Sequence, residues 1–232
     1  MRYVINNQCL HLFETEQDIF YKFCTMNTTE NAIDNRLEAL TNLSQGDFKA
    51  FLYDCDGTLA DNMGAHRDTY VHIASKAGLT IDGDMIDELA GWPVVNVVEE
   101  INKRYNSTFD PVAFAQERQQ LFFDEYIEKT LPIDFVVNHL KAHAGKVKIG
   151  VVSGGQRASV EKTLNLLVIR HLADVLVCAN ETPRGKPFPD PFLAAAEKLG
   201  VAPQDCLVFE DGDPGVQSAE AAGMKWIRID KV

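Results

Sequence analysis

Residues 48–58 read FKAFLYDCDGT, an apolar and aromatic run that gives way to two aspartates, a glycine and a threonine. A short run of this kind, bounded by turn residues, is typical of a buried strand that ends in a loop. We therefore predict a strand over Phe48–Asp54, with polar residues at its carboxyl end.

Further apolar runs follow in the second half of the chain, and helical patterns separate them. The predicted strands are Val147–Val152, Val175–Ala179, Cys206–Phe209 and Trp226–Ile229. The predicted helices between them are Gln156–Leu167, Pro191–Leu199 and Gly215–Ala222. Short apolar strands that alternate with helices indicate a parallel sheet covered on both faces. The sequence thus predicts an α/β fold with a Rossmann-like core and helices on both faces.

A long helical stretch separates the first two predicted strands. From Met63 to about Leu131 apolar residues recur at helical spacing, and glycine and proline divide the stretch. The predicted helices are His66–Lys76, Met85–Leu89, Val94–Arg104 and Val112–Lys129. We predict a four-helix unit over residues 63–132, inserted into a core made of residues 47–62 and 133–232.

Residues 1–46 are predicted to form a helical N-terminal extension. Thr28 suits a helix N-cap, apolar residues recur at helical spacing up to Leu43, and Gly46 would end the helix. The segment carries no visible chemistry, and its role stays open.

Charge and composition exclude several classes of function. The chain has 232 residues, with 34 Asp plus Glu against 22 Lys plus Arg and a formal net charge of −12. Proteins that hold nucleic acid or an anionic membrane need a basic face, so the charge argues against both partners. No apolar run approaches the roughly 18 residues of a membrane span, and the N-terminus lacks the apolar segment of a signal peptide. We therefore predict a cytoplasmic protein.

The chain has five cysteines, an odd number, and none of them form a C-x-x-C pair. This spacing argues against a zinc site and against a redox dithiol. We expect reduced thiols, with Cys178 and Cys206 packed in strands. Cys55 stands between two aspartates, and strand alternation predicts that it points away from them and packs in the core.

Polar loops follow the first four predicted strands. They are Asp54-Cys55-Asp56-Gly57-Thr58, Ser153-Gly154-Gly155, Arg184-Gly185-Lys186-Pro187 and Glu210-Asp211-Gly212-Asp213. The carboxyl ends of parallel strands meet at one edge of the sheet, where ligands bind in such folds. Converging carboxylates repel one another, and oxygen donors favour Mg²⁺ as their partner. A glycine-rich helix start and a lysine attract an anion, so the set predicts phosphoryl transfer.

The first loop resembles the D-x-D-G-T signature of the haloacid dehalogenase superfamily, and the other loops match its remaining motifs in order. Val208-Phe209-Glu210-Asp211, followed by Gly215 and Ala221-Ala222-Gly223-Met224, is similar to the beta-phosphoglucomutase-like phosphatase subgroup. The resemblance covers about residues 48–230. It implies that the four-helix insert is a cap domain.

The resemblance also implies roles for the residues of the loops. Asp54 would be the nucleophile and a Mg²⁺ ligand, and Asp56 the general acid–base, binding Mg²⁺ through its carbonyl. Ser153 and the Gly154 N–H would hold the transferring phosphoryl group, while Lys186 screens its charge. Two further acids would complete the metal site, namely Glu210 and Asp211.

Each of these residues also has a structural alternative. Ser153 could cap a helix, and Lys186 could be a solvated charge. Thr58 and Asp61 match positions that shape the first loop. Asp213 could bind metal, although Asp-Pro-Gly also starts helices, and we favour that structural role.

Three residues of the insert are candidates for contact with substrate. By resemblance, His66 would support the acid–base Asp56, although it could instead be an exposed histidine. Gly91-Trp92-Pro93 fits the cap loop that faces the active site, and Trp92 would lie nearest the substrate. Arg118 could reach substrate or lie on a solvated helix face. Mutases of the subgroup tend to carry an arginine after the loop glycine, and this chain has none there.

The resemblance therefore implies a Mg²⁺-dependent phosphatase. Its substrate would be a small phosphorylated metabolite, such as a sugar or polyol phosphate, hydrolysed through an aspartyl phosphate. The alternatives are a beta-phosphoglucomutase-type phosphosugar mutase, a receiver-type signalling domain and a non-catalytic binding protein. The sequence indicates no obligate protein partner and leaves the substrate and the oligomeric state open.

Overall fold

The computed structural model of the chain describes residues 35–89 and 92–232. Most of the predicted N-terminal extension lies outside these residues. Its last part, residues 35–43, is helical and ends before Gly46. Leu40 of this helix is fully buried, and Arg36 donates to the carbonyls of Val232 (3.1 Å) and Ile229 (3.2 Å). The helix is therefore part of the core.

The central sheet has five parallel strands in the order β5-β4-β1-β6-β7, which confirms the predicted α/β fold. The strands are β1 (Ala50–Tyr53), β4 (Lys148–Val152), β5 (Val175–Val177), β6 (Cys206–Glu210) and β7 (Lys225–Arg228). The chain runs from β1 through β4 to β5 on one side and places β6 and β7 on the other. The strand order thus reverses at β1, and the crevice beyond such a reversal is where these sheets bind ligands.

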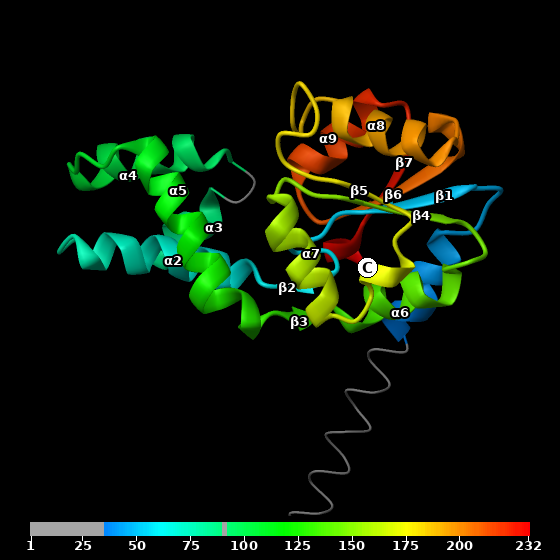
Figure 1. Cartoon of the computed structure of the whole chain (residues 1–232), viewed down its shortest axis with the longest axis horizontal. Coiled ribbons are helices and arrows are strands. Elements are labelled where there is room, and N and C mark those ends of the chain that lie inside the picture. Colours follow the sequence, from blue (N-terminus) through cyan, green and yellow to red (C-terminus); the bar gives the residue numbers. More distant parts are fainter. Residues whose placement is uncertain (1–34, 90–91) are drawn as a thin grey trace, which may run out of the picture.

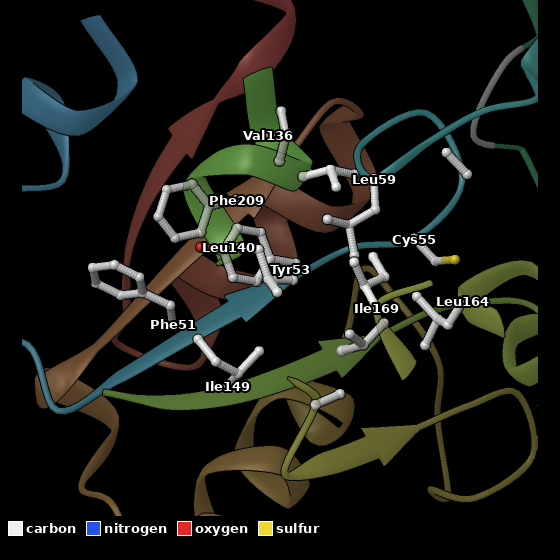
Figure 2. Packing of buried hydrophobic residues seen from close by; sticks show 14 of the residues in the cluster. Phe51, Tyr53, Cys55, Leu59, Val136, Leu140, Ile149, Leu164, Ile169 and Phe209 are labelled. Atoms are coloured by element: carbon white, nitrogen blue, oxygen red, sulfur yellow. The ribbon is translucent and has the colours of Figure 1, made fainter. Parts of the chain in front are cut away.

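Side chains of β1 alternate between two cores. Phe51 and Tyr53 belong to the larger core, shown in Figure 2, whereas Ala50 and Leu52 belong to the other. The larger core is closed by α6 (Asp134–His143), α7 (Arg157–Leu166) and the helix over residues 35–43. The opposite face is closed by α8 (Asp190–Leu199) and α9 (Asp213–Ala221), which lie together in Figure 1. Strands buried on both faces explain the continuous apolar runs of the sequence.

Four helices between β1 and β4 form a separate helical unit (Figure 1), with a hydrophobic cluster of its own. They are α2 (Met63–Lys76), α3 (Gly83–Glu88), α4 (Val94–Tyr105) and α5 (Pro111–Leu121). The Asp82 and Asp110 side chains cap α3 and α5 by accepting from backbone N–H groups of the first turn. A small antiparallel pair, β2 (Ala60–Asp61) and β3 (Leu131–Pro132), joins the unit to the sheet domain.

The structure differs from the predicted elements in several places. The predicted helix Val112–Lys129 is α-helical only to Leu121, and continues as a π-helical segment, Phe122–Tyr126, and a 3-10 turn, Ile127–Lys129. Helix α6 and the β2–β3 pair were not predicted, and β5 is shorter than Val175–Ala179. Short 3-10 turns also occur at Arg170–Leu172, Pro203–Asp205 and Ile229–Lys231.

Two global features follow from the described residues. Cys55, Cys178 and Cys206 are buried free thiols, as expected, although Cys178 lies just beyond β5. Within residues 35–89 and 92–232, no helix has both the length and the apolar character that a membrane crossing requires.

A buried histidine connects α6, β1 and the N-terminal helix. His139 is 0% exposed, and its ring nitrogens lie 2.9 Å from Ser44 Oγ and 2.8 Å from Tyr53 Oη. Its ring also stacks on Phe51. Burial, together with the neighbouring His143, lowers the pKa of His139 to about 3. His139 is therefore neutral in the folded protein at neutral pH.

Acid is expected to destabilise the fold through His139. The unfolded chain binds a proton near pH 6.5 but the folded chain does so only near pH 3, so this stability is lost as pH falls through that window. Between pH 7.5 and pH 5 His139 should remove about 2 kcal/mol from the free energy of unfolding. Urea titrations of the wild type and His139→Gln at both pH values measure it, with the exposed His171→Gln as the control. Equal pH dependence in the wild type and His139→Gln would contradict this account.

Candidate active site

The centre of the site is an ammonium group enclosed by oxygen atoms. Asp54 directly follows β1, and Lys186 lies on the loop between β5 and α8. Lys186 Nζ donates to Asp54 Oδ1 (2.6 Å), Glu210 Oε1 (2.6 Å) and the Val152 carbonyl (2.9 Å). An ammonium has three N–H donors, so all of them are used. The structure thus brings Asp54 and Lys186 together, as the sequence predicted.

Two acids at the end of β6 lie beside this pair. Glu210 Oε2 accepts from the backbone N–H groups of Asp211 and Gly212, both at 3.0 Å. Thr58 Oγ1 donates to Asp211 Oδ1 at 3.1 Å. Carboxylate oxygens of Asp54, Glu210 and Asp211 all lie within 4.8 Å of one another. Asp56 contributes no side-chain oxygen to this cluster.

The charges of this cluster do not balance. Burial raises the pKa of Asp54 well above its ordinary value, and neighbouring carboxylates add to the effect while Lys186 opposes it. Burial and the charge of Glu210 raise the pKa of Asp211 to about 6. Burial alone would lower the pKa of Lys186, but Asp54 and Glu210 raise it above its ordinary value. The cluster holds one ammonium group and three carboxyl groups, so a further positive charge would be stabilised there.

Asp56 lies in a different environment from Asp54. Its Oδ1 accepts from Asn62 Nδ2 at 2.6 Å and lies 3.5 Å from His66 Nε2, while Ser153 Oγ is 3.5 Å from Oδ2. Burial alone would raise the pKa of Asp56. Hydrogen bonds from His66 and Asn62, and the positive charge of Arg118, outweigh burial and lower this pKa.

The orientation of His66 is fixed from the helical unit. Arg118 Nη2 lies 3.0 Å from His66 Nδ1, and the imidazole stacks on Phe122 with 3.9 Å between ring centroids. Arginine can only donate, so Nδ1 accepts and the ring proton of neutral His66 is on Nε2, facing Asp56. The Arg118 guanidinium also lies over the Tyr70 ring at 4.6 Å. Both residues thus contact the site network and are partly buried.

The loop after β4 presents backbone donors beside Asp54 and Asp56. Ser153 is buried, and its Oγ accepts from the Gly155 N–H at 2.9 Å. Gly154 is exposed. Gln156, and not Ser153, occupies the N-cap position of α7, so the capping alternative for Ser153 is wrong.

The remaining candidates lie outside this cluster. Trp92 is 52% exposed and starts the described chain after residues 90–91, so the predicted Gly91 lies outside the described residues. Asp213 pairs with Arg228 at the start of α9, and Asp61 is exposed in β2. Cys55 is fully buried in the larger core. These placements agree with packing for Cys55 and a structural role for Asp213.

Glycine is required at one position of the first loop. Gly57 has a φ of +86°, and a Cβ there would lie 2.3 Å from Asp211 Oδ2. A side chain would therefore be strained and would displace the carboxylate of Asp211. The glycine of the D-x-D-G-T loop thus leaves space for an acid from β6.

Sequence reasoning missed three contacts of the site. Asn62 holds Asp56, as described above. Gln156 Nε2 donates to Gln119 Oε1 at 2.6 Å and so links the Ser153 loop to α5. Ser218 of α9 donates to the Phe188 carbonyl at 2.6 Å, on the loop of Lys186. The bonds of Gln156 and Ser218 join segments that are distant in the sequence. Asn62 lies shortly after Asp56, and this place is the only indication of its role in the sequence.

Comparisons with known proteins agree on one family. The family model described as haloacid dehalogenase-like hydrolase matches residues 51–229. Fructose-1-phosphate phosphatase YqaB of Escherichia coli is 32% identical over 78% of this chain and 96% of its own length. Beta-phosphoglucomutase of Bacillus subtilis is 29% identical over 76% of this chain and 80% of its own length.

A solved structure supports the same fold. The crystal structure of CbbY from Rhodobacter sphaeroides in complex with phosphate has a TM-score of 0.68 and 18% identity, and the match covers 77% of this chain and 84% of that one. At this identity the likeness concerns the fold alone. The family model and the sequence relatives agree with what the strand ends carry, namely the aspartates, the lysine and the acids. The chain belongs to the haloacid dehalogenase-like hydrolase family.

Proposed function

We propose that the protein is a phosphatase of small phosphorylated sugars or polyols that uses Asp54 as its nucleophile. The observation that carries this proposal is the position of Asp54, 2.6 Å from the buried Lys186 ammonium and beside the acids of β6. A carboxylate held against a cation, with anion-binding groups around it, is suited to attack on phosphorus.

The acids fit a divalent metal ion. Asp54, Glu210 and Asp211 offer only oxygen donors, and the raised pKa values of Asp54 and Asp211, with the unbalanced charge of the cluster, favour the binding of a cation. Both oxygens of Glu210 already accept from Lys186 and the backbone, so Asp54 and Asp211 are the more available ligands. We propose Mg²⁺, held by these acids and by the Asp56 carbonyl. When bound, Mg²⁺ supplies positive charge that offsets the charge of the transferring phosphoryl group.

Phosphoryl transfer would occur in two steps at Asp54. An Asp54 carboxylate oxygen attacks phosphorus, and the bond from phosphorus to the substrate oxygen breaks. Lys186 favours the ionised form of Asp54 and orients it through the bond to Oδ1. The resulting aspartyl phosphate is then attacked by water. That second step releases inorganic phosphate and restores the carboxylate.

Asp56 is placed to move the proton in both steps. Its Oδ1 faces Asn62 and His66, so Oδ2 is the oxygen left to carry the transferred proton. In the first step the protonated form of Asp56 gives its proton to the leaving oxygen. In the second step the resulting carboxylate, which His66 and Asn62 stabilise, accepts a proton from the attacking water. Arg118 acts through His66 by setting its ring orientation.

Ser153 and the Gly154 N–H would hold the phosphoryl oxygens, while the positive charge of Lys186 would offset their negative charge. Gly154 is exposed, and the loop stands beside Asp56 through the Ser153 hydroxyl. Backbone N–H groups before a helix attract anions, and α7 starts directly after this loop. The contact of Ser153 with Asp56 and the helix that follows the loop support this proposed role.

The helical unit would act as a cap over this site. We keep the boundaries 47–62 and 133–232 for the core and 63–132 for the cap, and we propose that Trp92 lines the substrate side. His66 of α2 contacts the acid–base Asp56 directly. Arg118 of α5 acts on Asp56 through its contact with His66. Substrate selection would then depend on the cap, whereas the chemistry depends on the core.

A phosphosugar mutase is the second candidate, because Bacillus subtilis beta-phosphoglucomutase is a relative. A mutase must also hold the second phosphate of a bisphosphate. Two valines, Val94 and Val95, follow Pro93 and carry no charge. Arg157 lies near the phosphate loop, but its guanidinium donates to Glu181. The described residues of this region therefore favour a monophosphate and hydrolysis.

A substrate screen tests the proposed function. The protein is incubated with Mg²⁺ and a panel of hexose, pentose and polyol phosphates, and released phosphate is measured. We expect steady phosphate release from at least one of these esters. This expectation agrees with the name of the Escherichia coli relative, a fructose-1-phosphate phosphatase. Conversion of a hexose 1-phosphate to its 6-phosphate without free phosphate would favour the mutase. No reaction with any ester would contradict both functions.

A further inference from the structure

We propose that α9 positions Lys186 for catalysis, through Ser218 and Gly215. The inference rests on the proposed function, because it assigns positioning residues to the same site. Neither residue reaches a phosphoryl group in this account. Ser218 acts on the loop that carries Lys186, and Gly215 acts on Glu210, a partner of Lys186.

Ser218 anchors the Lys186 loop to the sheet domain. Its side chain is 0% exposed, and its hydroxyl donates to the Phe188 carbonyl at 2.6 Å. Phe188 follows Lys186 by two positions, and its own N–H closes a turn onto the Gly185 carbonyl at 3.0 Å. The bond from Ser218 is thus made at the edge of the turn that presents the ammonium group.

Other bonds hold the two ends of the loop. Glu181 accepts from Arg157 of α7 at 2.6 and 2.8 Å, and the Ala179 N–H donates to the Gly155 carbonyl at 2.9 Å. Arg184 pairs with Asp190 across the loop, at 3.2 Å and 2.8 Å, and its guanidinium lies over the Phe188 ring. The Thr182 hydroxyl donates to the Arg184 carbonyl. These contacts hold the start of the loop and its junction with α8. The turn around Lys186 is held against the sheet domain by the side-chain bonds of Lys186 itself and of Ser218.

Gly215 provides the space in which Glu210 lies. A Cβ at Gly215 would be 1.7 Å from Glu210 Oε1, 1.9 Å from its Cδ and 2.6 Å from its Cγ. Glu210 is 3% exposed and is held by Lys186 and by two backbone N–H groups. It cannot move away without losing those bonds. The absence of a side chain at Gly215 therefore sets the position of the carboxylate that holds Lys186.

Both residues act from one face of α9. Residues three apart in a helix are neighbours on its surface, so Gly215 and Ser218 face the site together. One controls the loop that carries Lys186, and the other controls an acceptor of its ammonium group. Since Lys186 uses all its donors, a shift of the loop or of Glu210 changes its distance to Asp54. Misplacement of a charged group near the reacting atoms lowers kcat strongly.

The test compares Ser218→Ala with Ser44→Ala. Ser44 is a buried serine that packs against the same sheet domain, and its hydroxyl bonds go to His139 and the Thr41 carbonyl. We expect Ser218→Ala to lower kcat about tenfold while KM changes less than about threefold, because the misplaced lysine affects the reacting state most. Ser44→Ala should lose stability but keep kcat within about twofold.

Two further variants complete the test. Ser218→Cys keeps a weak donor of similar size, so it should recover part of kcat and decides the matter if Ser218→Ala does not fold. Gly215→Ala should lower kcat more than Ser218→Ala. A kcat for Ser218→Ala that equals that of Ser44→Ala would overturn the inference while the wild type stays active. If Ser218→Ala does not fold, an unchanged kcat in both Ser218→Cys and Gly215→Ala would overturn it. A wild type without phosphatase activity would instead reject the proposed function.

Discussion

Replacement of Asp54 by asparagine is expected to lower the rate of phosphate release at least about a thousandfold. The amide has nearly the same shape and can still accept the hydrogen bond from Lys186 that Asp54 Oδ1 receives at 2.6 Å. It has no ionised oxygen with which to attack phosphorus. The measurement is phosphate release from the best ester of the substrate screen, at saturating concentration.

A matched variant separates loss of the nucleophile from loss of negative charge. Asp47 is exposed and precedes β1, whereas Asp54 follows it. Asp47→Asn should therefore keep the wild-type rate within about twofold. A residual rate in Asp54→Asn of more than a tenth of the wild-type rate, with folding intact, would contradict the assignment of the nucleophile.

Removal of divalent metal ions is the second change with a large expected effect. Chelation should lower phosphate release at least about a hundredfold, and added Mg²⁺ should restore it. The physical reason is the cluster of Asp54, Glu210 and Asp211 oxygens within 4.8 Å of one another, where Lys186 supplies too little positive charge. The measurement is the rate before chelation, after it and during titration with Mg²⁺.

The acids after β6 provide an internal control for the metal site. Asp211→Asn should raise the Mg²⁺ concentration for half-maximal activity about tenfold or more, because one ligand loses its charge. Asp213→Asn should leave that concentration unchanged, since Asp213 pairs with Arg228. Activity that survives chelation, or equal effects of the two variants, would contradict the metal site as described.

The central sheet was predictable because its inner strands, β1, β4 and β6, are buried on both faces. Runs such as FKAFLYD around β1 are short, apolar and bounded by turn residues, and the fold places such runs side by side. Helix α6 was missed because Phe135, Val136 and Val137 form a short apolar run, in which helix and strand have the same pattern. The α-helix changes to a π-helix at Phe122, where the ring packs on His66. The spacing of apolar residues does not change there, so the sequence does not indicate it.

The strand-end acids were predictable for the same reason as the strands. Asp54 and Glu210 lie at the carboxyl ends of neighbouring strands, so the topology alone brings them together. The contacts that adjust them were not predictable. Ser218 and Phe188 are 30 positions apart, and Arg118 reaches His66 over 52 positions. Sequence patterns give the elements that carry these residues, but the hydrogen bonds depend on how the helices pack.

The most direct test of the account is to capture the phosphoryl group on the protein. Substrate labelled in its phosphate is mixed with the enzyme and Mg²⁺, the reaction is stopped with acid during turnover, and the protein is digested. We expect label on the peptide that contains Asp54, released by hydroxylamine as an acyl phosphate is, and none in Asp54→Asn. Turnover without any label on the wild-type protein, or label on a different residue, would contradict the account.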